Sequence, residues 1–261
     1  MDIKLRCQNI IVIGGGSGIG YATAQKLLDK GACNVIIASR NMMKCKEACK
    51  KLEFDHTSQK VNAIEFDICN ISSHDEMLHK ATELVGKIPD GLVISSGMNF
   101  DGNNWKGFNI SETDWDSVMD TDLKGVFFLI RNFSNYLYGY SVKGNICVVS
   151  SISAHRDLLS PYQVAKNAIS GIVHAYGKHL CERGIVLNCV EPGATDGGML
   201  RNLDQYTDGI REGKAWNDNS IRRVIRPEEI AEVVCFLMST LGEVMSGTCL
   251  LAGGGCKALS R

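Results

Sequence analysis

Tyr162 and Lys166 stand four residues apart in the segment SPYQVAK, a spacing that places both side chains on one face of a helix. The segment also carries the signals of a helix start. Ser160 is a suitable N-cap residue, Pro161 suits a first turn, and Gln163 completes an S-x-x-Q capping box. We therefore expect Tyr162 in the first turn of a helix, with the Lys166 ammonium one turn away.

This placement would suit proton transfer by the Tyr162 phenol. A general acid or base works best when its pKa lies near the working pH, so a phenol starting near about 10 must fall by about three units. The helix dipole and the Lys166 ammonium should both lower the Tyr162 pKa. Because a Tyr and a Lys at this spacing are more often structural, the neighbouring residues decide the interpretation.

Two apolar runs supply such neighbours. The run in GNICVVSSISAH ends in Ser150 and Ser151, whose hydroxyls could polarise a carbonyl by donating a hydrogen bond to its oxygen. The run in GIVLNCVEPGATD is closed by Pro192 and Gly193, which should turn the chain at the same edge of a sheet. A catalytic site at the carboxyl ends of these two strands is expected.

A glycine-rich turn follows the first apolar run, in NIIVIGGGSGIGYATAQKLL. A turn between a strand and a helix would aim backbone N–H groups and a helix amino end at one point, where an anion such as a pyrophosphate could bind. The spacing of Gly14, Gly18 and Gly20 is G-x-x-x-G-x-G rather than G-x-G-x-x-G. A tight turn needs glycine for steric reasons alone, so the position of these glycines is the stronger signal.

The end of the second apolar run, VIIASRN, bears on the choice of cofactor. Dinucleotide-binding folds place an acidic residue here to bind the ribose hydroxyl, or an Arg to accommodate a 2′-phosphate. This chain has Ser39 and Arg40 instead of an acid. The pair predicts NADP(H) as the preferred cofactor, with NAD(H) possible.

The elements that must position these residues alternate between short apolar runs and longer stretches with helical spacing. Continuous apolar runs indicate strands buried on both faces, and their alternation with helices predicts an α/β fold with a doubly wound parallel sheet of about seven strands. The expected strands are 10–13, 35–38, 61–66, 91–94, 145–149, 185–190 and 248–252. No linker interrupts residues 1–261, which we expect to form a single domain, and the long segment 197–226 is expected to be a substrate lid.

Composition narrows the class of partner. The chain has 261 residues, a formal net charge of −1 and no run of Lys or Arg, which argues against nucleic-acid and anionic-membrane binding. No stretch approaches the length of a membrane-spanning helix, and a cytoplasmic location is expected. The eleven cysteines include no CxxC motif, so we expect free thiols, with Cys45 and Cys49 on one helix face, and no metal site.

Taken together, these landmarks resemble the classical short-chain dehydrogenase/reductase family over about residues 10–255. They are the glycine turn, the Tyr162 and Lys166 pair behind Ser151, the Pro192–Gly193 turn, and the closing segments RPEEIAEVVCFLMS and GTCLLAGGG. The resemblance implies a single Rossmann-type domain, a homotetramer or homodimer, and hydride transfer between NAD(P)(H) and a carbonyl or alcohol.

The resemblance also implies residue roles. Tyr162 would be the acid/base, Lys166 would bind the nicotinamide ribose and lower the Tyr162 pKa, and Ser151 would hold the substrate oxygen. Asp67 matches the residue that contacts adenine, and Thr195 the one that holds the nicotinamide carboxamide. The implied cofactor contacts are Gly14, Ser17, Gly18, Ile19, Gly20, Ser39, Arg40, Asp67, Ile68, Ser95, Gly97, Tyr162, Lys166, Pro192, Gly193 and Thr195.

The chain departs from the family pattern in places. Ile13 replaces the usual Thr, and ISSG replaces Asn-Asn-Ala-Gly after the fourth strand. Asp122 stands where the family commonly has an Asn that anchors a water chain to the lysine, and its charge should partly offset the effect of Lys166. Ser151 precedes Tyr162 by eleven residues rather than about thirteen, which implies a short loop with a solvent-facing His155, followed by Arg156 and Asp157.

Three functions remain open at this point. The first is an NADP(H)-dependent carbonyl reductase with Tyr162, Ser151, Lys166 and Asp122 in its catalytic site. It could resemble a 3-oxoacyl-carrier-protein reductase, with the acidic carrier docked on Lys124, Arg131 and Lys178. The second is an NAD-linked sugar, polyol or hydroxysteroid dehydrogenase. The third, of another class, is a nucleotide-binding sensor or scaffold with impaired catalysis.

Overall fold

The computed structural model describes residues 4–98, 109–156, 160–197 and 219–256. A seven-stranded sheet runs through the molecule with the strand order β3-β2-β1-β4-β5-β6-β7, and every neighbouring pair is parallel. The strands are β1 (Asn9–Ile13), β2 (Asn34–Ser39), β3 (Lys60–Glu65), β4 (Gly91–Ile94), β5 (Gly144–Val149), β6 (Ile185–Pro192) and β7 (Cys249–Ala252). The predicted α/β class and the seven strands are confirmed.

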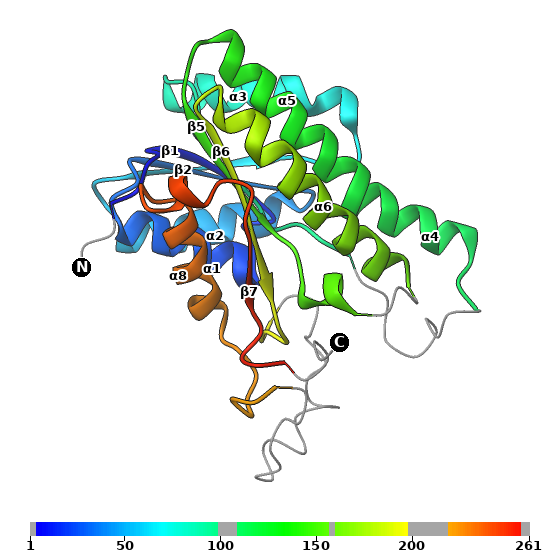
Figure 1. Cartoon of the computed structure of the whole chain (residues 1–261). Coiled ribbons are helices and arrows are strands. Elements are labelled where there is room, and N and C mark those ends of the chain that lie inside the picture. Colours follow the sequence, from blue (N-terminus) through cyan, green and yellow to red (C-terminus); the bar gives the residue numbers. More distant parts are fainter. Residues whose placement is uncertain (1–3, 99–108, 157–159, 198–218, 257–261) are drawn as a thin grey trace.

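Helices cover both faces of this sheet (Figure 1). Figure 1 shows α1, α2 and α8 on one side and α3, α5 and α6 on the other. The α-helices are α1 (Gly18–Asp29), α2 (Met42–Asp55), α3 (His74–Val85), α4 (Glu112–Met119), α5 (Gly125–Gly139), α6 (Pro161–Cys181) and α8 (Pro227–Leu237). Short turns of other helix types are η1 (Ile71–Ser73), η2 (Asp120–Lys124), η3 (Ile152–His155) and η5 (Gly242–Met245).

The strands are buried on both faces, as their continuous apolar runs predict. In β1, Ile11 and Ile13 belong to the core under α3, α5 and α6, whereas Ile10 and Val12 belong to the core under α1, α2 and α8. Successive strand residues point to opposite faces, so one apolar run supplies both cores. β1 is an interior strand of the sheet and pairs with both β2 and β4.

The predicted start of α6 is confirmed. The helix begins at Pro161, and the Ser160 hydroxyl accepts a hydrogen bond from the Gln163 backbone N–H at 3.3 Å. The Ser160 hydroxyl also donates to the Gln163 side-chain oxygen at 3.1 Å. The two residues of the capping box thus bond to each other, which fixes the first turn of α6 and the direction of Tyr162.

All eleven cysteines are free thiols, as predicted, and only Cys33 and Cys181 are exposed. Cys45 and Cys49 are both buried on α2, on the shared face that their spacing predicts. No helix within the described ranges has the length and apolar character to span a bilayer.

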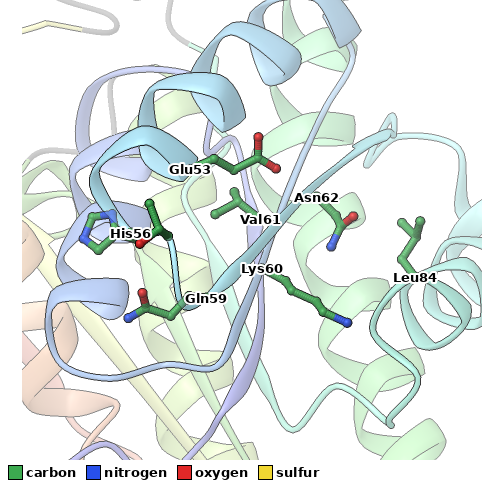
Figure 2. A pocket seen from close by; sticks show the side chains of 8 residues that line it. Glu53, His56, Gln59, Lys60, Val61, Asn62 and Leu84 are labelled. Atoms are coloured by element: carbon green, nitrogen blue, oxygen red, sulfur yellow. The ribbon is translucent and has the colours of Figure 1, made fainter.

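The predicted lid at 197–226 lies mostly outside the described residues, which include only Gly197 and the part from Asn219 onward. A separate surface hollow of about 400 Å³ lies where α2 ends and β3 begins (Figure 2). Because its walls come from the amino end of β3, this hollow lies at the opposite end of the strands from the predicted site. It is lined by Glu53, His56, Thr57, Gln59, Lys60, Val61, Asn62 and Leu84.

Candidate active site

Tyr162, Lys166 and Ser151 come together at the carboxyl edge of the sheet. Tyr162 is the second residue of α6, and the Lys166 ammonium nitrogen lies 5.2 Å from the centroid of its ring. Ser151 follows β5 and caps η3, where its hydroxyl accepts a hydrogen bond from the Ser153 backbone N–H at 3.1 Å. Ser151 also acts on the Tyr162 phenol, whose pKa it lowers. The three residues chosen from spacing therefore share one site.

The pKa of Tyr162 differs from the sequence-based expectation. Burial raises the Tyr162 pKa above its ordinary value, Lys166 and Ser151 act to lower it, and Asp122 raises it further. The predicted lowering by Lys166 is present, but burial outweighs it and the net direction is upward. The sequence shows the lysine, but it does not show how completely the phenol is removed from water.

Asp122 lies on a π-helical turn, η2, between α4 and α5. Its Oδ1 lies 3.8 Å from the Lys166 Nζ and accepts a hydrogen bond from the Met98 N–H at 2.9 Å, while its Oδ2 is buried without a partner. Burial acts to lower the Lys166 pKa, but Asp122 and Tyr162 raise it overall. The predicted closeness of Asp122 to Lys166 is confirmed, and the pair keeps Lys166 in its charged form.

The glycine turn fits a bound dinucleotide. Gly14 has φ +78°, and a Cβ there would lie 2.9 Å from the Ser95 backbone, so the turn packs backbone against backbone. A Cβ on Gly197 would lie only 3.8 Å from the Gly18 Cα, which places the segment after β6 beside the amino end of α1. Glycines on both sides thus leave a cradle at a helix amino end, where a pyrophosphate could bind.

The ends of β2 and β3 lie beside this turn. Arg40 is exposed and forms no ion pair within the described ranges, although its charge acts to lower the pKa of Cys69, which burial raises. The Ser39 hydroxyl accepts from the Asn41 N–H at 3.3 Å, and Asp67 Oδ1 accepts from the Cys69 N–H at 3.0 Å. Arg40 therefore offers an unpaired guanidinium at the edge where the cofactor ribose is expected.

The other residues assigned to the cofactor follow strands that end at this edge. The Ser95 N–H donates to the Ile13 carbonyl at 2.9 Å, next to the glycine turn, and Gly97 follows two residues later. The Ile68 carbonyl accepts from His74 Nε2 at 2.9 Å. The Thr195 hydroxyl donates to the Gly193 carbonyl at 2.9 Å, which holds the turn after Pro192. Ser17 is the N-cap residue of α1, and Ile19 and Gly20 lie in its first turn.

One contact of this region, between His155 and Glu191, has no signal in the sequence. His155 was expected to face solvent from a loop, but it ends the 3₁₀ turn η3, and its Nε2 lies 2.6 Å from the buried Glu191 carboxylate. Its side chain is 43% exposed, so the expected solvent exposure is confirmed although the ring also contacts a buried acid. Glu191 carried no signal in the sequence, because a single Glu within an apolar run has no spacing to interpret. Asp157 lies outside the described residues.

The chain is similar to known proteins over most of its length. The family model described as Enoyl-(Acyl carrier protein) reductase matches residues 14–257. A short chain dehydrogenase of Claviceps purpurea (strain 20.1) is 30% identical, with 94% of each chain covered. Dehydrogenase/reductase SDR family member 4 of Homo sapiens is 28% identical, with 94% of this chain and 86% of the human protein covered.

The fold is also shared with solved structures. The crystal structure of L-sorbose reductase from Gluconobacter frateurii, complexed with NADPH and L-sorbose, superposes with a TM-score of 0.86 at 21% identity over all of both chains. The match across residues 14–257, the relative at 30% identity and the parallel sheet agree with one another. This chain belongs to the short-chain dehydrogenase/reductase family of oxidoreductases.

Proposed function

We propose that the protein is an NADP(H)-dependent oxidoreductase that reduces a ketone or other carbonyl to a secondary alcohol, or catalyses the reverse reaction, with Tyr162 as acid/base. The observation that carries this proposal is the convergence of Tyr162, Ser151 and Lys166. Ser151 acts to lower the Tyr162 pKa, and the Lys166 ammonium lies 5.2 Å from the tyrosine ring centroid. Such a group can bind a carbonyl oxygen and deliver a proton to it.

Each residue has a separate task in this mechanism. Ser151 donates a hydrogen bond to the substrate oxygen, and Tyr162 transfers its phenolic proton to that oxygen as negative charge develops there. Lys166 remains charged because Asp122 raises its pKa, and that charge favours the tyrosinate left behind. The bound nicotinamide supplies or accepts the hydride.

The preference for NADP(H) rests on Arg40. Its exposed guanidinium follows β2 and has no carboxylate partner in the described parts of the chain. A guanidinium binds phosphate with two parallel hydrogen bonds, and Ser39 in place of an acid removes the repulsion of a 2′-phosphate. The L-sorbose reductase of similar fold is complexed with NADPH, which supports the same choice here.

The substrate could be either an acyl group bound to a carrier protein or a small free molecule. The matching family model is named for an acyl-carrier-protein substrate, and the reductase of similar fold is complexed with a sugar. Of the cations that could dock an acidic carrier, Lys124 pairs with Asp120 at 3.0 Å and Arg131 lies over the Phe128 ring at 4.5 Å. Two of the three cations are thus engaged within the chain, and only Lys178 makes no ion pair among the described residues. We therefore favour a small free ketone over a carrier-bound substrate.

The first test is a titration of the purified protein with NADPH and with NADH, followed by nicotinamide fluorescence. We expect tighter binding of NADPH, and then NADPH oxidation by at least one member of a panel of ketoses, steroid ketones and acetoacetyl thioesters. Binding of neither cofactor would overturn the proposal and favour a scaffold without turnover.

The second test is Tyr162→Phe. The variant should retain NADPH affinity and lose about 10²–10⁴-fold in turnover, the usual contribution of a positioned acid/base. A variant that keeps most of its rate would overturn the mechanism while leaving the cofactor assignment in place.

A further inference from the structure

The Glu191 carboxylate is a buried acid that the proposed mechanism does not use. Its side chain is 1% exposed, and each of its oxygens has one short contact. The Ser170 hydroxyl donates to Oε1 at 2.6 Å, and His155 Nε2 lies 2.6 Å from Oε2. Because a carboxylate only accepts hydrogen bonds, both partners must present a hydrogen to it, which fixes the imidazole orientation.

The three residues of this network come from three elements that carry the active site. His155 ends η3, four residues after Ser151. Ser170 lies on α6 one turn beyond Lys166, and its hydroxyl also lies 3.2 Å from the Lys166 carbonyl. Glu191 itself stands at the end of β6, directly before Pro192. One carboxylate therefore joins the turn of Ser151 to the helix of Tyr162 and Lys166.

A second contact strengthens the same junction. The Asn167 side-chain N–H donates to the Ala154 carbonyl at 2.8 Å, so α6 also binds the backbone of η3. This bond and the Glu191 contacts restrain the turn from two sides. The distance between the Ser151 and Tyr162 hydroxyls depends on that restraint, because each hydroxyl belongs to one of the two joined elements.

The neighbouring thiols raise the question of a metal ion. Ligand atoms of Cys189, Glu191 and Cys249 lie within 4.8 Å of one another. These ligand atoms already have partners within the protein. Both Glu191 oxygens have hydrogen-bond donors, and the Cys249 thiol lies 3.8 Å from the Ser170 carbonyl. Burial and Cys249 also raise the pKa of Cys189, which favours the thiol over the thiolate that a metal needs.

We propose that Glu191 is a positioning residue of the active site, which acts through His155 and Ser170 to hold Ser151 at the correct distance from Tyr162. This inference rests on the proposed function. It predicts that loss of the carboxylate slows hydride and proton transfer without weakening cofactor binding. A carboxylate needed only for folding would instead affect stability and leave the rate of the folded enzyme unchanged.

The test uses Glu191→Gln, His155→Ala and the double variant, with Glu182→Gln as a control at the exposed end of α6. The readouts are NADPH affinity, thermal stability and the single-turnover rate of hydride transfer with saturating NADPH. A displacement of about 1 Å in such a site costs about 10²-fold in rate, so we expect losses of roughly 10-fold to 10²-fold in each single variant. NADPH affinity and the Glu182→Gln enzyme should be unchanged.

The double variant shows whether Glu191 and His155 act together or independently. If Glu191 acts through His155, the double variant should be no slower than the slower single variant. The primary deuterium isotope effect with deuterated NADPH should rise in the variants, because the chemical step becomes more limiting. Added imidazole should partly restore His155→Ala, since the His155 side chain is 43% exposed.

Three results would overturn the positioning role. They are an unchanged single-turnover rate in Glu191→Gln and His155→Ala, multiplicative losses in the double variant, and a loss of thermal stability alone. If Glu191→Gln does not fold, Ser170→Ala removes only one hydroxyl from the same carboxylate and serves with the same readouts. Wild-type activity that Tyr162→Phe abolishes and Glu191→Gln retains would overturn this inference but not the proposed function. An inactive wild type would overturn both.

Discussion

The Lys166 Nζ lies 3.8 Å from Asp122 Oδ1, and both side chains are almost fully buried. The lysine therefore acts on two groups at once, because it also faces the Tyr162 ring. Asp122 holds the ammonium in its charged form, and at the same time its own negative charge raises the Tyr162 pKa. The pKa of the proposed proton donor, Tyr162, thus depends on two opposing charges, those of the buried Lys166 and the buried Asp122.

Replacing Asp122 by Asn tests that balance. Carbonyl reduction needs protonated Tyr162, so its rate falls as pH rises through the Tyr162 pKa. Asp122 raises that pKa, and Asp122→Asn should shift the alkaline limb of the rate profile to lower pH. Asp120→Asn, which alters an exposed ion pair with Lys124 on the same turn, is the matched control. An identical profile in Asp122→Asn and the wild type would contradict the coupling.

Replacing Arg40 by Ala tests the cofactor choice. Loss of charge-assisted hydrogen bonds to a 2′-phosphate should weaken NADPH binding about 10-fold to 10²-fold and leave NADH binding nearly unchanged. Lys44→Ala removes a nearby exposed cation from α2 and serves as the control. Dissociation constants for both cofactors give the answer, and equal losses for the two would refute the phosphate assignment.

Gly20→Ala tests the packing of the glycine turn. A Cβ at Gly20 would lie 2.3 Å from the Gly14 carbonyl oxygen, and backbone cannot move aside as a side chain can. We expect a loss of about 1–3 kcal/mol in the free energy of unfolding, together with loss of NADPH binding. Gly171→Ala, on α6, meets no atom within 4 Å and should stabilise the protein by about 0.5–1 kcal/mol. Normal stability and NADPH affinity in Gly20→Ala would contradict the packing described here.

Glu229 gives a prediction on pH and stability. Its hydrogen bond from Arg223, and then that from the Arg226 N–H, lower the Glu229 pKa from 4.5 to about 2. A lowered pKa stabilises the fold above the unfolded value, and the contribution is lost as pH falls from about 4.5 toward about 2. Glu229→Gln should therefore cost about 1 kcal/mol at pH 7 and less below pH 4.5.

Denaturant unfolding at several pH values measures this effect. Glu228→Gln is the control, because Glu228 is exposed in the same first turn of α8 and makes no ion pair in the described part of the chain. A stability difference for Glu229→Gln that stays constant from pH 7 to pH 4 would contradict the assignment.

Much of the architecture could be predicted because the strands are buried on both faces. Runs such as 10–13 and 91–94 are apolar throughout, and this pattern marks both their position and their place in a parallel sheet. The start of α6 was equally readable, since Ser160, Pro161 and Gln163 form a local signal. Such a signal can be interpreted from the sequence because the residues that form it are close together in the chain.

What could not be predicted depends on contacts between distant residues. Glu191 and His155 are 36 residues apart, and neither has a periodic partner in the sequence that indicates their bond. No residue type or spacing in the sequence indicates the π-helical turn that carries Asp122. The net direction of the Tyr162 pKa also depended on burial, which only the assembled site shows.

The strand order has a consequence for biosynthesis. β1, β2 and β3 are contiguous in sequence and adjacent in the sheet, so the half of the sheet that ends at Ser39, Arg40 and Asp67 is complete within the first 67 residues. The half that carries Ser151 and Tyr162 needs β5 and β6, which the ribosome delivers about a hundred residues later. Because chains fold from their amino end during synthesis, the nascent protein can order the half that we propose binds the adenosine end of the cofactor before any proposed catalytic side chain has been made.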